Sequence, residues 1–174
     1  ATSYLESDSM FRPWLIKTDS AGNIIWNVKL DAVADGITCS FAPTSDGGYI
    51  VIQSGFPSPG VISLIKTDSS GNMLWENTFP GFGESVAQTQ DGGYVVTGRT
   101  QLLGWELNSD VLVIRTDSLG NKLWDMTMGG SEDDAGYAVI QTSGKGFAIV
   151  GSTESYGAGG SDVWLIKLDK EAKK

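Results

Sequence analysis

The chain has 174 residues, of which 40% are hydrophobic and 19% charged, with 23 glycines and 5 prolines. This composition is typical of a globular domain that is long enough to bury a core, and no apolar run approaches the roughly 20 residues of a membrane-spanning helix. A net charge of -9 disfavours nucleic acid and anionic membranes as partners, and the absence of histidine excludes imidazole catalysis and the usual zinc and haem ligand sets.

The first part of the chain is predicted to be an incomplete unit. Residues 1–13 match the later pattern poorly, and their best alignment, with residues 152–163, predicts an inner strand and a connecting loop. Residues 14–19 and 23–30 are predicted to form a β-hairpin, because two apolar runs flank a short polar turn. The only cysteine, Cys39, excludes an intrachain disulfide and lies in an apolar run, which is typical of a buried small hydrophobe.

The strands predicted after this hairpin fall into two complete units and one shorter unit. Each unit has two strands joined by a tight turn and then a hairpin, and the last unit stops after its third strand. These elements are predicted at residues 37–44, 49–54 and 61–79, then 84–89, 94–99 and 110–128, and finally 136–142, 147–152 and 162–169. We therefore expect a single domain, residues 1–174, built from units at 1–30 (partial), 37–79, 84–128 and 136–169.

Two kinds of turn recur along the chain. In the first, an aspartate that can bond the backbone two residues on is followed by a glycine that can take the left-handed conformation. In the second, Asp-Gly-Gly-Tyr joins two apolar runs, and both glycines are expected to accept positive φ. We interpret the aspartates as turn formers rather than metal ligands. The recurrent turn positions are Asp19, Asp68, Asp117, Gly22, Gly71, Gly120, Gly48 and Gly93.

Three tryptophans mark the period of the repeat. Trp26, Trp75 and Trp124 follow one another at intervals of 49 residues, and a period of about 40–50 residues with four strands in each unit is typical of a propeller blade. Each tryptophan stands at the same place in an alternating strand, so we expect it to pack between adjacent blades. A row of aromatic platforms for sugars or quinones is the weaker interpretation. The predicted fold is an all-β propeller of four-stranded antiparallel blades, with about 13–14 strands and about 3.5 blades in the chain.

The repeated residues resemble a known class of propeller. Lys-Thr-Asp-Ser-x-Gly-Asn-x-x-Trp followed by Thr-x-Asp-Gly-Gly-Tyr is similar to the repeats of about 50 residues found in secreted and cell-surface proteins of archaea and bacteria. The resemblance covers residues 14–169. Asp-x-x-Gly-x-x-x-Trp also looks like the tryptophan-docking motif of quinoprotein dehydrogenase blades, but no position here matches their cofactor and calcium site. The resemblance implies a blade fold and an extracellular or cell-surface location, and it implies no activity. The chain departs from the pattern at residues 144–147, Gly-Lys-Gly-Phe.

The number of predicted units does not close a ring, because propellers typically have about four to eight blades. Three outcomes are open. Two chains could join into a ring of about seven or eight blades, the chain could be a fragment of a longer propeller, or open strand edges could pair from chain to chain into a filament. We favour association over a lone monomer, so the expected partner is a second copy or another protein.

The strongest candidate for a metal site is the acidic run Glu132-Asp133-Asp134. Calcium takes about six to eight oxygen ligands, but the chain contains no Asp-x-Asp-x-Asp-Gly loop, so a solvated acidic loop is favoured. A glycosidase would need two carboxyl groups about 5–10 Å apart in a pocket, and no pair stands out from the repeated turn aspartates. We predict no catalytic and no cofactor-binding residue.

The sequence therefore predicts a non-enzymatic structural or protein-interaction module that associates with itself outside the cell or at its surface. The alternative is a carbohydrate-binding or hydrolytic propeller with its site on the central axis or the loop face. A unique acidic or aromatic cluster on one face would favour the alternative, whereas strand contacts between chains would favour the first function.

Overall fold

The computed structural model describes residues 11–56, 60–100 and 108–170, with the backbone alone for residues 37–39 and 56. Within these residues the chain forms thirteen strands and no helix. It follows that the described part contains no helix capable of crossing a membrane. All pairing is antiparallel and joins strands that are consecutive in sequence.

The strands belong to four sheets, which we number 1 to 4 in chain order. Sheet 1 holds β1 and β2, sheets 2 and 3 hold four strands each, and sheet 4 holds β11, β12 and β13. The strands are β1 (Trp14–Thr18), β2 (Ile24–Lys29), β3 (Asp35–Pro43), β4 (Tyr49–Phe56), β5 (Val61–Thr67), β6 (Met73–Pro80), β7 (Phe82–Gln88), β8 (Tyr94–Arg99), β9 (Val111–Thr116), β10 (Lys122–Met128), β11 (Asp134–Gln141), β12 (Phe147–Thr153) and β13 (Asp162–Leu168).

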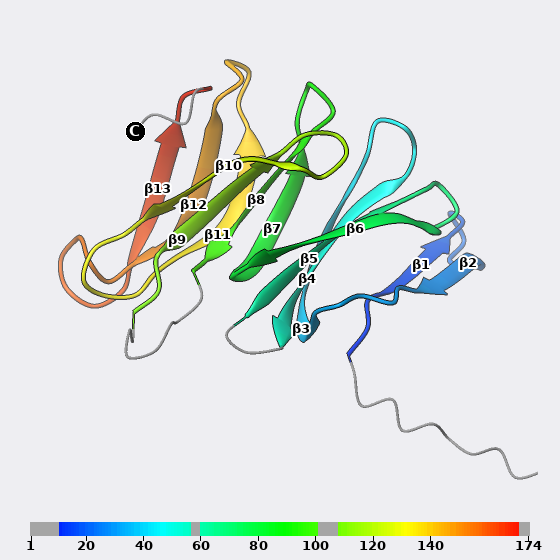
Figure 1. The fold of residues 1–174 in the computed structure, drawn as a ribbon, viewed down its shortest axis with the longest axis horizontal. Coiled ribbons are helices and arrows are strands. Elements are labelled where there is room, and N and C mark those ends of the chain that lie inside the picture. Colours follow the sequence, from blue (N-terminus) through cyan, green and yellow to red (C-terminus); the bar gives the residue numbers. More distant parts are fainter. Residues whose placement is uncertain (1–10, 57–59, 101–107, 171–174) are drawn as a thin grey trace, which may run out of the picture.

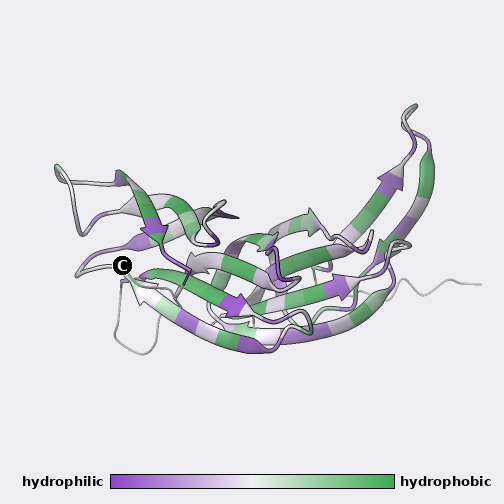
Figure 2. Cartoon of the chain, turned by 90° about the horizontal axis from the view of Figure 1, so that it is seen from above, coloured by the Kyte–Doolittle hydropathy of each residue, from purple (hydrophilic) through white to green (hydrophobic). Residues whose placement is uncertain are grey.

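The sheets stand in a row, with sheet 1 at one end and sheet 4 at the other (Figure 1). Seen from above, the row is curved (Figure 2). The first strands of sheets 2, 3 and 4 contact one another in order, β3 with β7 and β7 with β11. The first strands of sheets 2, 3 and 4 therefore lie next to one another, and in sheets 2 and 3 the fourth strand lies at the opposite edge of the sheet.

The hydrophobic core consists of three clusters, one at each junction between consecutive sheets. Leu30 of the first unit packs with Val51 and Ile65 of sheet 2. The next two clusters join sheets 2 and 3, and sheets 3 and 4, in the same way. Each large aliphatic side chain that is fully buried contributes about 1.5–3 kcal/mol, so the fold is stabilised chiefly by packing of one sheet on the next.

The third strand of each complete sheet is covered on both faces, and its sequence shows this. In β5 and β9 nearly every residue is buried, which matches their almost continuous apolar runs. The fourth strands, β6 and β10, alternate between less and more exposed residues, as strands with one face toward solvent do.

The first strand of each sheet begins two residues earlier than the sequence predicts, at positions 35, 82 and 134 instead of 37, 84 and 136. A β-bulge lies near each start, for example between Gly83 and Ser85. There two backbones approach closely, because a Cβ on Gly98 would lie 1.9 Å from the carbonyl oxygen of Phe82. The bulge allows strand pairing to continue beyond the glycine. The position of this bulge could not be predicted from the sequence pattern alone.

The two glycines of each Asp-Gly-Gly turn have different roles, which corrects the prediction that both take positive φ. Gly47 and Gly92 have φ of 84°. Gly48 and Gly93 do not have positive φ, but a Cβ on Gly48 would lie 2.1 Å from the carbonyl oxygen of Thr67. The second glycine is needed because the turn presses against the third strand.

The all-β prediction with four-stranded antiparallel sheets is confirmed, whereas the described residues form no closed sheet. The inner strand predicted within residues 1–13 falls largely on residues 1–10, which lie outside the described part, and residues 11–13 carry no strand. The side chain of Cys39 also lies outside the description.

Candidate interaction surfaces

The turn aspartates use both carboxylate oxygens to shape their own loops. Asp68 Oδ1 accepts hydrogen bonds from the backbone N–H groups of Ser70 (2.8 Å) and Asn72 (2.9 Å), and its Oδ2 accepts one from Asn72 Nδ2 (2.9 Å). The same bonds form at Asp19 and Asp117. The asparagine side chain is the largest cause that lowers the pKa of each carboxyl group below its ordinary value. Local hydrogen bonds therefore stabilise the ionised form of each turn aspartate.

Each repeat tryptophan lies edge-on against an aromatic ring of the following sheet. The ring centroids are 6.0 Å apart for Trp26 and Tyr49, and 5.8 Å apart for Trp75 and Tyr94. The third pair, Trp124 and Phe147, has a separation of 5.9 Å. Edge-to-face pairs contribute about 0.5–1.5 kcal/mol beyond the area they bury, so each tryptophan links its own unit to the next.

The turn glycine of the following unit makes room for this tryptophan. A Cβ on Gly120 would lie 2.6 Å from Trp75 Cζ3, and a Cβ on Gly71 would lie 2.9 Å from Trp26 Cζ3. Gly22 has the same backbone conformation, with φ of 86°, but nothing lies within 4 Å of its Cβ position. Gly22 thus has the backbone conformation that receives a tryptophan in the other units. At the N-terminal end of the row, however, no described residue covers it.

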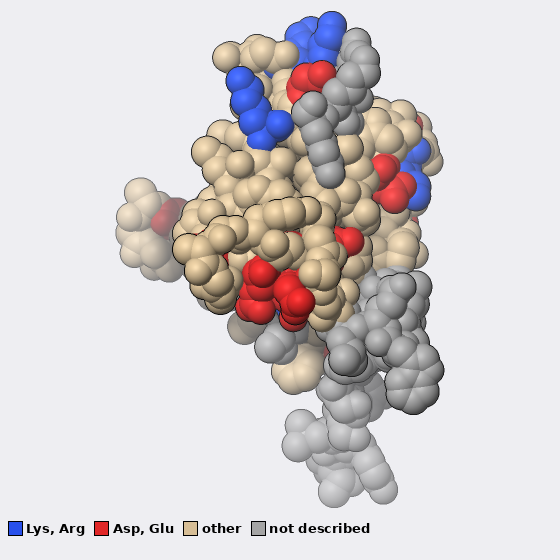
Figure 3. Space-filling model, turned by 90° about the vertical axis from the view of Figure 1, so that its left-hand side faces the viewer, with Lys and Arg blue, Asp and Glu red and all other residues tan. Residues whose placement is uncertain are grey.

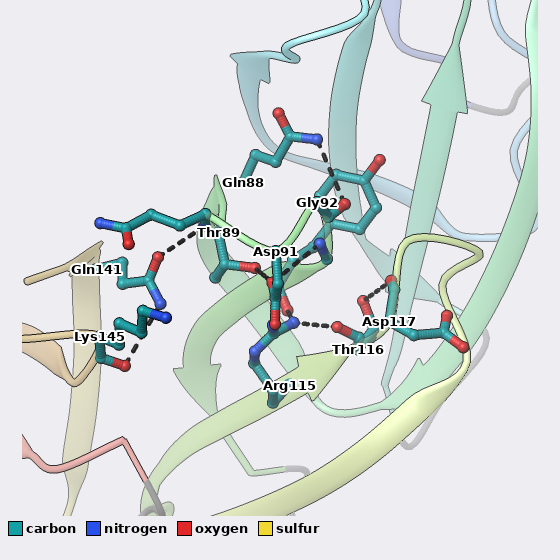
Figure 4. A network of polar contacts seen from close by, with 12 residues as sticks. Gln88, Thr89, Asp91, Gly92, Arg115, Thr116, Asp117, Gln141 and Lys145 are labelled. Carbon is teal, nitrogen blue, oxygen red and sulfur yellow. Dashed lines mark hydrogen bonds and ion pairs between the residues drawn. The ribbon is translucent and has the colours of Figure 1, made fainter.

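A buried cation supports each Asp-Gly-Gly turn from the third strand, and Figure 4 shows this for Arg115 and Asp91. Lys66 Nζ lies 2.9 Å from Asp46 Oδ2, and Arg115 Nη2 lies 2.6 Å from both oxygens of Asp91. The pKa of Asp46 is lowered first by the Thr44 hydroxyl bond and then by Lys66. The cations are about 5% exposed, while their carboxylate partners are more than half exposed.

Sheet 4 lacks this pair. Gly144 occupies the position of the aspartate, Lys145 occupies that of the positive-φ glycine with φ of 64°, and Lys167, at the position of Lys66 and Arg115, is exposed. The recurrence of a cation on the third strand and of Asp in the turn was visible in the sequence. Because the two residues are 20 or more positions apart, their pairing became clear only from the structure.

Glutamine side chains add a second link between consecutive sheets at this end. Gln88 Oε1 accepts a hydrogen bond of 2.7 Å from the backbone N–H of Ser45, and Gln141 Oε1 accepts one of 2.8 Å from that of Gln90. Figure 4 shows Gln141 and Lys145 of sheet 4 facing the Asp91 turn of sheet 3. Sequence analysis did not single out these glutamines.

The acidic run at 132–134 joins two loops rather than forming one ligand set. Asp133 Oδ1 accepts hydrogen bonds from the Ser109 backbone N–H (2.8 Å) and hydroxyl (2.9 Å), and these bonds lower the pKa of Asp133. Asp134 Oδ2 accepts from Ser155 Oγ (2.7 Å), whereas the Glu132 side chain is exposed. Among the described residues, no three His, Cys, Asp or Glu side chains come together in a way that could hold a metal ion.

The outer face of sheet 4 is apolar, and no other part of the described chain covers it; we call it the C-terminal face. Val163 is 83% exposed and Leu165 is 72% exposed. The residues at the same repeat positions in β9, Val111 and Val113, are both 0% exposed. Figure 3 views the molecule from this end and shows a largely uncharged middle, with basic side chains and an acidic group near the top and a cluster of acidic side chains lower down. The remaining large exposed members of the face are Tyr137, Ile140 and Val150.

The opposite end of the row carries an open apolar groove, which we call the N-terminal groove. It has a volume of about 580 Å³ and lies between β1 and the exposed edge of sheet 2. Trp14, Ile16 and Phe41 are 56%, 47% and 61% exposed. Phe41 packs edge-on against Tyr49 at 6.4 Å. The groove is lined by Pro13, Trp14, Leu15, Ile16, Lys17, Thr18, Trp26, Phe41 and Tyr49.

Comparisons with known proteins bear on the fold alone. Neither protein-family models nor curated protein sequences match the chain. Among solved structures, the chain is similar to the crystal structure of a protein of unknown function from Bacteroides caccae, with a TM-score of 0.53 and 10% sequence identity. The match covers 93% of this chain and 56% of the other, so the chain spans little more than half of that protein.

Proposed function

We propose that the chain is a β-propeller-type module of the secreted and cell-surface repeat class, without enzymatic activity, whose role is to associate with a second copy of itself. Two features support the proposal: the repeated docking of a tryptophan on the following sheet, and the exposure of both terminal surfaces. The extracellular or cell-surface location comes from the resemblance of the repeat and stays a prediction.

The exposed C-terminal face carries the proposal. Inside the row, Ile62 and Leu64 of sheet 2 are 0% exposed, because Leu112 and Ile114 of sheet 3 cover them. In sheet 4, Val163 and Leu165 occupy the repeat positions that Ile62 and Leu64 have in sheet 2. Side chains at these positions lie in a junction between sheets in the rest of the row.

The N-terminal end offers the complementary surface. Trp14 and Ile16 of β1 occupy the repeat positions of Leu112 and Ile114, which are only 6% and 2% exposed within the row. A contact of Val163 and Leu165 in one copy with Trp14 and Ile16 in another would repeat the internal junction. Because the two surfaces differ, such contacts are head to tail, and they generate a ring or a filament.

The mass of the full chain in solution tests this proposal. We expect a mass above that of the 18.5 kDa chain, rising with concentration. Leu165→Glu should shift the mass toward that of a single chain, because it places a charge in an apolar contact. Leu74→Glu is the matched control, since Leu74 is 58% exposed but lies on a fourth strand, and it should leave the mass unchanged. A single-chain mass for the unaltered protein at about 100 µM would overturn the proposal, because it would place the dissociation constant well above that concentration.

The alternative, a carbohydrate-binding or hydrolytic site on the axis or loop face, has no observation of its own among the described residues. Retention of a soaked sugar by the full chain would revive it.

A further inference from the structure

We propose that the N-terminal groove binds an extended strand of a partner protein. This strand pairs with the open edge of β1, and its sequence has an aromatic residue followed by alternating apolar residues. The proposal rests on the proposed function in so far as it takes β1 and β2 to be the last two strands of a repeat unit. Trp14 and Ile16 line the groove and also belong to the head-to-tail contact, but the occupant proposed here is different and it pairs with the main-chain edge of β1.

The molecule itself contains three examples of the proposed contact. In sheets 2, 3 and 4, the strand that corresponds to β1 pairs along its whole length with the strand before it: β4 with β5, β8 with β9, and β12 with β13. In the described residues β1 pairs with β2 alone. One edge of β1 therefore presents the main-chain groups that bind a strand elsewhere in the fold.

The groove lies where the side chains of such a strand would pack. Phe41 occupies the repeat position of Val86 and Val139, which are 5% and 4% exposed, whereas Phe41 is 61% exposed. In the next junction, Ile50 and Ile52 of β4 belong to the cluster that covers Val86. The groove is thus the counterpart of a position that is filled in the rest of the row, and no other described residue fills it.

The groove is also continuous with an existing junction between sheets. Leu15 and Tyr49 line the groove and at the same time border the cluster that holds sheet 1 on sheet 2. A bound strand would extend that cluster toward Phe41. This continuity favours a β-strand over a compact small molecule, since a strand can pack against the apolar residues of the groove and also form hydrogen bonds with the main-chain edge of β1.

The three internal examples predict the chemistry and the register of the partner. The strands that pair in this way read Tyr-Ile-Val-Ile-Gln, Tyr-Val-Val-Thr-Gly and Phe-Ala-Ile-Val-Gly. Tyr49 pairs with Thr67 and Tyr94 with Thr116, so the partner's aromatic residue should lie opposite Thr18. An inner strand was predicted within residues 1–13, and it is the competing occupant of this edge. The sequence of residues 1–10, Ala-Thr-Ser-Tyr-Leu-Glu-Ser-Asp-Ser-Met, lacks the alternation of the three internal strands, which favours a strand supplied from outside this segment.

The test uses a labelled peptide with the sequence of residues 91–99, Asp-Gly-Gly-Tyr-Val-Val-Thr-Gly-Arg, titrated into the full chain and followed by fluorescence anisotropy. We expect saturable binding. Within the chain, Val95 packs in one cluster with Val139, which has the same repeat position as Phe41. The Val95 side chain of the bound peptide should therefore face Phe41. A peptide with Val95→Asp, or a chain with Phe41→Asp, should weaken binding at least tenfold.

Controls separate this inference from self-association. Leu165→Glu changes the other end of the row and removes competition from a second copy for Trp14 and Ile16, so the peptide should bind that variant at least as tightly as it binds the unaltered chain. Phe41→Ser repeats the test without adding charge. Binding that the Val95→Asp peptide retains in full, or that appears only after residues 1–10 are removed, would overturn the inference. So would a lack of binding to both the unaltered chain and the Leu165→Glu variant.

Discussion

Strands β9 and β13 occupy the same place in two successive units, yet β9 is buried on both faces and β13 on one face only. Val111 and Val113 are completely buried in β9, whereas Val163 and Leu165 in β13 are the most exposed apolar residues of their sheet. The sequences of the two strands, Val-Leu-Val-Ile-Arg and Val-Trp-Leu-Ile-Lys, are almost equally apolar. Apolar character in these strands therefore reflects a place in the repeat, whereas burial depends on whether a following sheet covers the strand.

The cation at the end of these two strands shows the same contrast. Arg115 is buried and bound to Asp91, whereas Lys167 is exposed beside a turn that has Gly144 in place of aspartate. An uncovered cation keeps its hydration and does not need a fixed carboxylate. The loss of the aspartate thus fits the position of sheet 4 at the end of the row.

The largest difference in stability between internal and terminal surfaces is expected when a tryptophan is replaced by alanine. Trp75→Ala should lower the free energy of unfolding by about 3–5 kcal/mol, because it opens a cavity between sheets 2 and 3. The terminal Trp14→Ala should lower it by less than about 1 kcal/mol, since Trp14 is 56% exposed. Urea unfolding at low protein concentration measures both variants, and equal losses would contradict the distinction between internal and terminal surfaces.

A matched pair of glycines gives the next largest difference. Gly22 and Gly120 have φ of 86° and 80°, so an alanine at either position carries a similar backbone cost of about 1–2 kcal/mol. Gly120→Ala also forces a Cβ against the ring of Trp75, which adds about 1–3 kcal/mol. Thermal unfolding should therefore show the greater loss for Gly120→Ala. If Gly22→Ala is as harmful, the turn itself, and not the tryptophan, requires glycine.

The buried cation predicts a smaller, pH-dependent effect. Asp46→Asn should lower stability at pH 7 by about 1 kcal/mol, a modest value because the carboxylate is 59% exposed and screened by solvent. The pKa of Asp46 is lower in the folded chain than its ordinary value of 3.8. The ionised carboxylate therefore stabilises the fold above that value, and this stabilisation is lost as the pH falls through the folded pKa.

The difference between the unaltered chain and Asp46→Asn should accordingly narrow as the pH falls from 4 toward 2. Unfolding midpoints measured over this range check the sign. A difference that grows on acidification would show that Asp46 acts through something other than its charge.

The smallest effect is expected where the terminal unit is given the missing aspartate. Nothing lies within 4 Å of a Cβ on Gly144, and its φ is not positive, so Gly144→Asp introduces no strain. Because Lys167 is exposed, the new pair should stabilise the chain by less than about 0.5 kcal/mol. Gly144→Asn is the neutral control. A gain as large as the loss in Asp46→Asn would indicate that Lys167 is as well shielded as Lys66.

Much of the fold could be predicted from the sequence because its signals are local. The strands follow from apolar runs between Asp-Gly turns, and the 49-residue spacing of Trp26, Trp75 and Trp124 divides the chain into units. The antiparallel order follows from short connections between consecutive strands. The bulges at the first strands were missed, since they depend on close contact between glycines such as Gly83 and Gly98, which are far apart in sequence.

The candidate surfaces could be predicted only in part. The apolar character of β13 was visible in the sequence, but the exposure of its side chains was not predicted. The N-terminal groove was not foreseen, because Phe41 reads as a core residue by its sequence, like Val86 and Val139 at the same position. Its exposure results from strands that the described part of the first unit does not contain.

The most direct test of head-to-tail association is a cross-link between the two terminal surfaces. In a chain with Cys39→Ser, Trp14→Cys is placed in one population and Val163→Cys in another, and the two are mixed with a short thiol cross-linker. Leu112 and Ile62, at the corresponding repeat positions, both lie within 4 Å of a Cβ on Gly81, so these sites should be close across a contact between chains. We predict a covalent dimer joined through positions 14 and 163 that Leu165→Glu abolishes. Absence of this product, with the unaltered chain at its single-chain mass of 18.5 kDa, would contradict the association.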